Sequence, residues 1–140
     1  MGKTKIGGII PTPLRQELFT AVDIERLDGL GDVQWTESAE PLSIEEAIAL
    51  LADCVVGIGS WRTPWPDAEL LAGCLELKMW VHAAGSVRHM FGPHLDGREL
   101  VIASCAPAIA ENVAEITLAQ LIIGVRRTLE NGVANRSGVA

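Results

Sequence analysis

The segment best suited to bind a ligand is Ala84-Gly85-Ser86-Val87, which directly follows an apolar run of strand length. Its side chains are small, so its consecutive backbone amides can reach a carboxylate or a phosphate. A tight turn without a ligand explains the same residues, and the spacing alone favours that simpler interpretation. A second segment, Gly59-Ser60-Trp61-Arg62, follows another apolar run and would lie at the same edge of a sheet.

The histidines do not have the spacing of a metal site. His82, His89 and His94 are seven and five residues apart, so no two of them share one helical face, as metal-binding pairs usually do. We therefore expect no metal. His82 falls in or just after an expected strand, where a half-buried structural residue is the favoured interpretation and a catalytic base is the alternative. Arg62 and Arg88 flank the expected pocket, either facing a ligand or simply solvated.

The three cysteines, Cys54, Cys74 and Cys105, are odd in number, far apart and set among apolar neighbours. This pattern favours buried, reduced and inert thiols over a disulfide framework. No charged residue lies close enough to favour a reactive thiolate, which is the alternative.

Composition excludes several classes of protein. The chain has 140 residues, of which 49% are hydrophobic and 21% charged, and its net charge is -7. This length suits one domain with a real core, and the acidic balance argues against a nucleic-acid partner. Tyrosine is absent and phenylalanine occurs only twice, so a stacking platform for single strands is not expected.

A membrane span is not expected either. The longest apolar candidate, Leu118 to Val125, contains Gln120 and is too short to cross a bilayer. The amino terminus leads directly into a strand-like run and carries no signal segment. We therefore expect a soluble, cytoplasmic protein with no membrane partner.

Strand-length apolar runs alternate with segments of helical character, which predicts an α/β fold with a doubly wound, parallel, five-stranded sheet of the flavodoxin-like kind. Most runs are continuous, as in strands that are covered by helices on both faces. The five runs are Lys5 to Ile10, Val33 to Thr36, Cys54 to Ile58, Leu77 to Ala83 and Leu100 to Cys105.

The expected helices carry start signals. Ser43 to Glu46 forms a Ser-x-x-Glu capping box, which begins a helix that should end at Asp53. Acidic residues in Pro66 to Glu69 begin another helix, and Gly73 closes it. The apolar pattern between Pro13 and Leu30 predicts one broken helix or two short ones.

The last helix should run from Ala108 to about Leu129 and is apolar nearly all round, so it needs burial on several sides. The residues that follow it are expected to form a frayed tail. The predicted organisation is therefore a domain over residues 1–107, a long apolar helix over 108–130, to which the resemblance described below assigns a crossover role, and a flexible tail over 131–140.

Other ligands of this architecture are not supported. Pro11 and Pro13 stand where a flavin phosphate loop needs free amides, and the acids of a phosphoacceptor domain are missing. Gly57-Ile58-Gly59 lacks the third glycine and the helix start of a dinucleotide fingerprint, and Gly29-Leu30-Gly31 precedes a strand. We expect no dinucleotide site within this chain.

Three segments in order resemble the amino-terminal part of the NAD-dependent D-isomer-specific 2-hydroxyacid dehydrogenases, the family that includes phosphoglycerate and glyoxylate/hydroxypyruvate reductases. The similarity covers residues 5–127. The segments are Gly59 to Pro64, Leu77 to Val87, and Val113 to Ala119 followed by Arg126-Arg127.

The resemblance implies a flavodoxin-like substrate domain and a helix that crosses into an NAD-binding Rossmann domain outside these residues. It implies that Ala84, Gly85, Ser86 and Val87 supply amides to the substrate carboxylate, and that Ser86 also approaches the cofactor. Ser60 and Trp61 would line the substrate side of the cleft. The helix from Val113 to Val125 would lie near a homodimer interface.

The implied substrate is a small 2-hydroxy acid or 2-oxoacid, and the implied cofactor is NAD, with NADP as an alternative. The family's catalytic Arg, Glu and His follow the crossover helix, so no catalytic residue is expected in this chain and it should be inactive alone. Val87 and Ile109 depart from the family's usual Gly and Asn, which leaves the substrate open.

Two other hypotheses belong to different classes. The chain could be a stand-alone binding or oligomerisation module that associates through its apolar helix. A weaker alternative is cofactor-independent catalysis by His82 or a cysteine.

Overall fold

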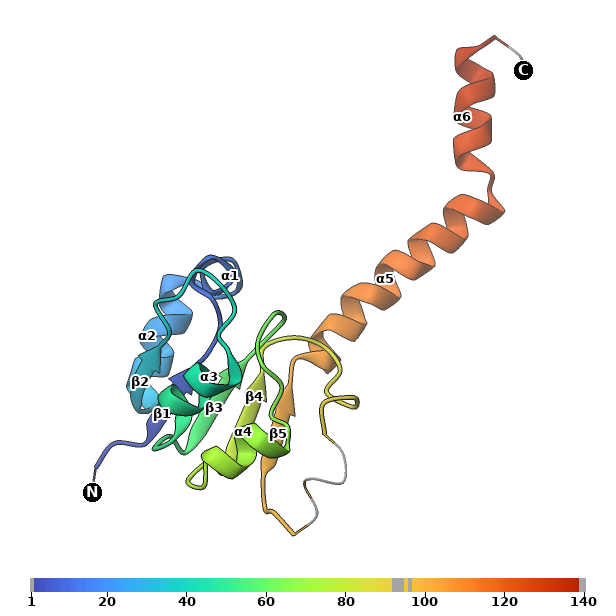
Figure 1. Cartoon of the computed structure of the whole chain (residues 1–140). Helices are drawn as coiled ribbons and strands as arrows, with labels where there is room; N and C mark the ends of the chain where they lie inside the picture. The colour runs from blue at the N-terminus through green and yellow to red at the C-terminus, as the bar shows by residue number, and fades with distance from the viewer. Residues whose placement is uncertain (1, 92–94, 96, 139–140) are drawn as a thin grey trace. The chain divides into compact units, whose positions relative to one another are not determined.

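A computed structural model describes residues 2–91, 95 and 97–138 of the chain. In this part of the chain, five parallel strands form one sheet in the order β2-β1-β3-β4-β5 (Figure 1). This is the strand order of a doubly wound, flavodoxin-like sheet, as the sequence predicts. The strands are β1 (Lys5–Gly8), β2 (Asp32–Trp35), β3 (Val56–Gly59), β4 (Met79–His82) and β5 (Val101–Ser104).

Helices cover both faces of the sheet. On one face, α1 (Thr12–Leu18) and α2 (Ala21–Leu30) pack over an apolar cluster that contains Ile6, Ile10 and Ile58. On the other face, α3 (Ile44–Leu51) and α4 (Ala68–Gly73) enclose the larger cluster around the fully buried Trp80. The region from Pro13 to Leu30 therefore forms two short helices, one of the two predicted outcomes.

The predicted helix starts are confirmed. Ser43 and Glu46 form a reciprocal capping box at the start of α3, and Thr20 forms a second one with Asp23 at the start of α2. The Asp67 side chain accepts a hydrogen bond from the Leu70 amide and so caps α4. The α3 helix ends at Leu51, before the predicted Asp53, because the chain turns there and Asp53 pairs with Lys5 of β1.

Close packing against the sheet depends on glycines within the strands. A Cβ atom on Gly59 would lie 2.6 Å from Cζ2 of Trp80 and 3.0 Å from Oγ1 of Thr63. A Cβ atom on Gly8 would overlap the Trp35 ring. These two positions let large aromatic rings lie directly on the backbone of the sheet.

The chain divides into two compact units, residues 1–105 and 106–140. The second unit contains α5 (Ala106–Val125) and α6 (Thr128–Arg136). The predicted helix over residues 108–129 is thus two helices, because Arg127 adopts a left-handed conformation with φ of 49°.

The expectation of a frayed tail from residue 131 is wrong for residues 131–136, which belong to α6. Glu130 lies in the first turn of α6 and Arg136 in its last, and at these positions the charge of each side chain interacts favourably with the helix dipole. Gly138 follows the helix with φ of 68°, which suits a glycine after a helix end. The structure does not describe residues 139 and 140.

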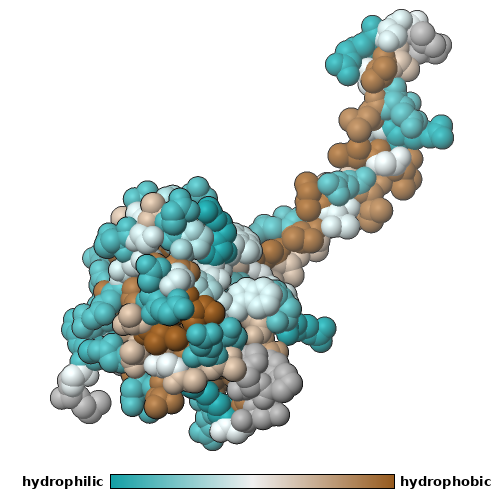
Figure 2. All heavy atoms as spheres, in the orientation of Figure 1, coloured by the Kyte–Doolittle hydropathy of each residue, from teal (hydrophilic) through white to brown (hydrophobic). Residues whose placement is uncertain are grey.

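The α5 helix has no buried residue, and Figure 2 shows apolar side chains exposed along it. It is also long and apolar enough, by length and composition, to cross a membrane. The apolar run Leu118 to Val125 is too short by itself, but the helix that contains it also continues through the polar residues Glu111, Asn112 and Glu115. Core helices pass the same test, so the absence of a membrane partner stays a prediction.

Candidate functional site

The candidate site lies where the neighbouring strands β3 and β4 end. Two hydrogen bonds join the loops that follow them: the Ala83 amide donates to the Gly59 carbonyl at 2.8 Å, and the Ser60 hydroxyl donates to the Ala83 carbonyl at 3.0 Å. Ser60 is almost fully buried. Ser60 thus holds the two loops at a constant separation.

The loop after β3 is a tight turn that Thr63 closes. The Ser60 amide donates to the Thr63 hydroxyl at 3.1 Å, and this hydroxyl donates back to the Ser60 carbonyl at 2.8 Å. Between them, Arg62 has a φ of 61°, which is unusual for a residue with a side chain. Strained backbone of this kind is common where a loop must present a side chain to a ligand.

The loop after β4 leaves backbone donors free. Among the described residues, no protein group accepts a hydrogen bond from the amides of Gly85, Ser86 or Val87. The carbonyls on either side of these amides are used: that of Ala84 accepts from the Cys105 amide at 2.9 Å, and that of Val87 accepts from the Met90 amide at 3.0 Å. The loop is therefore anchored at both ends while its donors face no protein partner.

A cavity of about 380 Å³ lies between the two loops. It brings together Ser60, Trp61, Gly85 and Ser86 of the predicted residues. Ala84 is buried beneath the same loop, and Val87 lies in the loop without lining the cavity. The lining also includes Arg62, Trp65, His82, His89 and Met90.

His82 also lines this cavity, although its position in the sequence favoured a purely structural role. Its exposed fraction is 2%, and its Nδ1 atom is buried without a hydrogen-bond partner in the described part of the chain. Burial, and to a lesser extent His89, lowers the pKa of His82 below its ordinary value. The sequence feature that could have predicted His82 as a cavity residue was its position at the end of a strand, directly before the Gly85 loop.

The rim of the cavity carries positive and aromatic side chains. The rings of Trp65 and His89 meet edge to face with centroids 4.9 Å apart. Arg62 pairs with Glu40 at 3.7 Å, and both side chains are largely exposed. No carboxylate is among the described residues that line the cavity, although the chain as a whole is acidic.

The cysteines lie away from this site. Cys54 and Cys74 are free and buried, as expected, and burial raises the pKa of each thiol, which disfavours a reactive thiolate. Cys105 was expected to be buried and is exposed, because the sheet face beside the end of β5 is open there.

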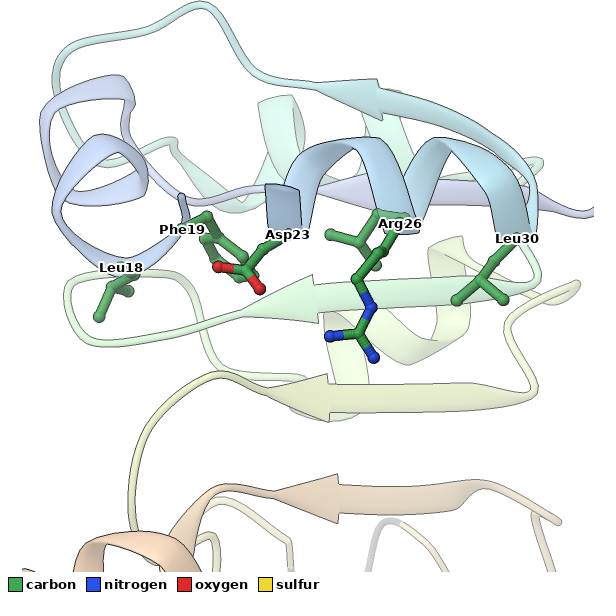
Figure 3. A pocket seen from close by; sticks show the side chains of 6 residues that line it. Leu18, Phe19, Asp23, Arg26 and Leu30 are labelled. Atoms are coloured by element: carbon green, nitrogen blue, oxygen red, sulfur yellow. The ribbon is translucent and has the colours of Figure 1, made fainter. Parts of the chain in front are cut away.

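That open face forms a second, apolar groove. One part of it, of about 390 Å³, runs along α2 between Leu18 and Leu30 (Figure 3), and another, of about 360 Å³, lies over β1, β3 and β4. The two parts share Phe19, Leu27 and Leu30. Over the sheet the lining is almost wholly apolar, so this groove lacks the convergent polar groups of a reaction site.

The described residues contain no group of three or more metal-binding side chains. His94, which was weighed as a ligand with the other two histidines, lies outside the described residues.

Comparisons with known proteins support the fold. No protein-family model and no curated protein matches the sequence. Among solved structures, the acyclic imino acid reductase Bsp5, in complex with NADPH and D-Arg, matches 98% of this chain with a TM-score of 0.71 and 21% identity. This chain covers 42% of that protein.

A 2-hydroxyacid dehydrogenase from Ketogulonicigenium vulgare Y25 matches 99% of the chain, with a TM-score of 0.65 and 14% identity. D-lactate dehydrogenase from Aquifex aeolicus, complexed with NAD and lactic acid, matches 97% with a TM-score of 0.57 and 16% identity. The chain has the fold of part of a 2-hydroxyacid dehydrogenase. This dehydrogenase-like chain covers 41% and 38% of the two proteins, about two-fifths of their length.

Proposed function

We propose that the chain is the substrate-binding part of an oxidoreductase that transfers hydride between NAD(H) and a small D-2-hydroxy acid or 2-oxoacid. The observation that carries the proposal is the cavity in which the free amides of Gly85 and Ser86 meet the Ser60 loop. The shared fold with 2-hydroxyacid dehydrogenases supports it.

In this proposal the chain binds and orients the substrate. The amides of Gly85, Ser86 and Val87 donate to its carboxylate, as consecutive backbone amides do in other anion sites. The Ser60 hydroxyl keeps the two loops in register through Ala83, and Trp61 forms a wall of the cavity. Ala84 supports the loop from below through its bond to Cys105.

The described residues do not fit a complete dinucleotide site. Pro11 precedes α1 and Pro13 lies in its first turn, where a dinucleotide fold needs glycines and free amides. We therefore assign binding of NAD, or of NADP, mainly to polypeptide outside residues 1–140, with Ser86 as the one contact from this chain. No catalytic residue is assigned here, and the chain alone is proposed to be inactive.

The test is a titration of the ¹⁵N-labelled chain with glyoxylate and pyruvate, followed by NMR. We expect the amide signals of Gly85, Ser86 and Val87 to shift with a Kd in the millimolar range, because a few hydrogen bonds supply the affinity. With NADH added, we expect no oxidation above background. Unchanged loop signals, or turnover comparable to that of a complete dehydrogenase, would contradict the proposal.

We further propose that the chain forms a homodimer through the α5 segment from Val113 to Val125. Seven large apolar side chains in this segment are at least 42% exposed, and burying each one contributes about 1.5 to 3 kcal/mol. The members are Val113, Ile116, Leu118, Leu121, Ile122, Ile123 and Val125.

The same exposed helix favours the second candidate function, a stand-alone binding or oligomerisation module without activity. The two functions differ in the titration described above. If the chain associates and the 2-oxoacids leave the Gly85 loop unchanged, the module is the better explanation. We also propose a cytoplasmic location for either function.

A further inference from the structure

The cavity contains a buried hydrogen-bonding side chain whose role the fold does not explain. His82 is the last residue of β4 and lies between Gly59 of β3 and Ser104 of β5 in the sheet register. Its backbone carbonyl accepts a hydrogen bond from the Cys105 amide at 3.3 Å. This backbone role suits any residue, so it does not account for an imidazole with a 2% exposed fraction.

The burial of the ring indicates which nitrogen carries the proton. Nδ1 is buried with no partner among the described residues. An orphaned buried N–H is rarer in proteins than an unused acceptor, so the proton belongs on Nε2. Because the ring lines the cavity and Nδ1 is buried, Nε2 is the nitrogen available to a ligand.

The groups around His82 favour an anion. Arg62 comes from the loop after β3 and His89 from the loop after β4, and both line the same cavity. Cys105 follows β5 next to the backbone of His82. The neighbouring acid, Glu40, is paired with Arg62 and does not line the cavity. The His82 ring therefore shares the cavity with the free amides of Gly85 and Ser86 and with Arg62, and no carboxylate is among the described lining residues.

We propose that His82 binds one carboxylate oxygen of the ligand through Nε2–H and so selects small carboxylates at this site. This inference rests on the proposed function for the cavity and adds a donor to the amides of the Gly85 loop. Since a bound anion favours the imidazolium form, binding takes up a proton, and affinity increases as the pH falls from 8 to 6.

The test uses the whole 140-residue chain, with oxamate as a 2-oxoacid analogue and acetate as a simple carboxylate. NMR of the ¹⁵N-labelled imidazoles should show the Nε2–H tautomer of His82 in the free chain. Oxamate should shift the Nε2 signal and raise the pKa of His82. A free chain with the proton on Nδ1, or a ring signal unmoved by saturating oxamate, would overturn the assignment.

Three variants separate binding from folding. His82→Gln places an amide donor at a similar reach and should retain oxamate affinity within about threefold, whereas His82→Leu removes the donor and should lose about tenfold to a hundredfold. Lys78→Gln is the control, because Lys78 is exposed, precedes β4 and does not line the cavity, and it should bind nearly as the parent chain does. If His82→Leu fails to fold, equal affinities of the parent chain at pH 6 and pH 8 would still refute the proposal.

The outcomes also distinguish this inference from the proposed function. If oxamate binds and His82→Leu binds it equally well, the role of His82 is wrong while the dehydrogenase proposal stands. If acetate binds as tightly as oxamate and His82→Leu loses both, His82 is a carboxylate donor and the 2-oxoacid function is wrong. Binding of neither ligand to the parent chain contradicts both proposals.

Discussion

The glycine at the end of β3 is required by the aromatic ring beside it. A Cβ atom at Gly59 would meet Trp80 at 2.6 Å, and Trp80 is fully buried within the core. We expect Gly59→Ala to lower the free energy of unfolding by about 2 kcal/mol, as overpacking in a core does. Urea denaturation measures this change.

The matched control for Gly59 is Gly29. It lies within α2, and a Cβ atom there would meet nothing within 4 Å. We expect Gly29→Ala to stabilise the protein by about 0.5 to 1 kcal/mol through helix propensity. Equal effects of the two substitutions would show that Gly59 is not packed as described.

Arg98 is a structural arginine that the sequence did not reveal. Its guanidinium donates to the carbonyls of Leu71, Cys74 and Leu77, at and beyond the carboxyl end of α4. We expect Arg98→Leu to destabilise the fold by about 2 kcal/mol, because hydrogen bonds from a charged donor are among the stronger ones. Thermal unfolding checks this, and Arg88→Leu, at an exposed position, should have a far smaller effect.

Burial of His82 makes stability depend on pH. Its pKa in the folded chain is lowered from 6.5, mainly by burial and secondly by His89. Below pH 6.5 the unfolded chain therefore binds more protons at this site than the folded chain, so stability falls as the pH falls. We expect His82→Gln to lose less stability than the parent chain between pH 7.5 and pH 5.5 in urea denaturation. Identical losses would mean that His82 is not buried.

At the scale of elements, local signals predicted helix starts better than helix ends. Ser43 and Asp67 accept hydrogen bonds from orphan amides in the first turns of α3 and α4, so a few residues determine each start. The break between α5 and α6 depends instead on the left-handed backbone of Arg127. Arginine has no local preference for that conformation. The apolar pattern therefore predicted one helix that continues through Arg127.

The two loops of the candidate site also combine a feature that neighbouring residues encode with a contact between residues distant in sequence. Small residues from Ala84 to Val87 indicated an exposed set of amides, and the structure leaves three of those amides without a protein partner in its described part. The bond from the Ser60 hydroxyl to Ala83 spans strands that are far apart in sequence. No local pattern encodes such a bond, because it depends on the register of β3 against β4.

At the scale of the whole molecule, the exposed α5 surface predicts association. We expect sedimentation velocity to show a dimer that dissociates on dilution, because association would bury the apolar side chains of α5. Ile122→Glu should shift the equilibrium strongly towards the monomer. Gln120→Glu adds the same charge to the same helix at a polar position and should leave association nearly unchanged.

A monomer at all concentrations would contradict the proposed dimer. A dimer that both substitutions leave intact would place the contact elsewhere, for which the apolar groove beside Phe19 and Leu27 is the next surface to test.

The sequence by itself determined the alternation of strands and helices and the capped starts of α3 and α4, because each depends on neighbouring residues. The tertiary structure alone decided that His82 and Ser60 meet in one cavity and that Cys105 is exposed. These features arise from strand register and from which faces the helices cover. Contacts between residues distant in sequence set both, and one sequence read in order does not display them.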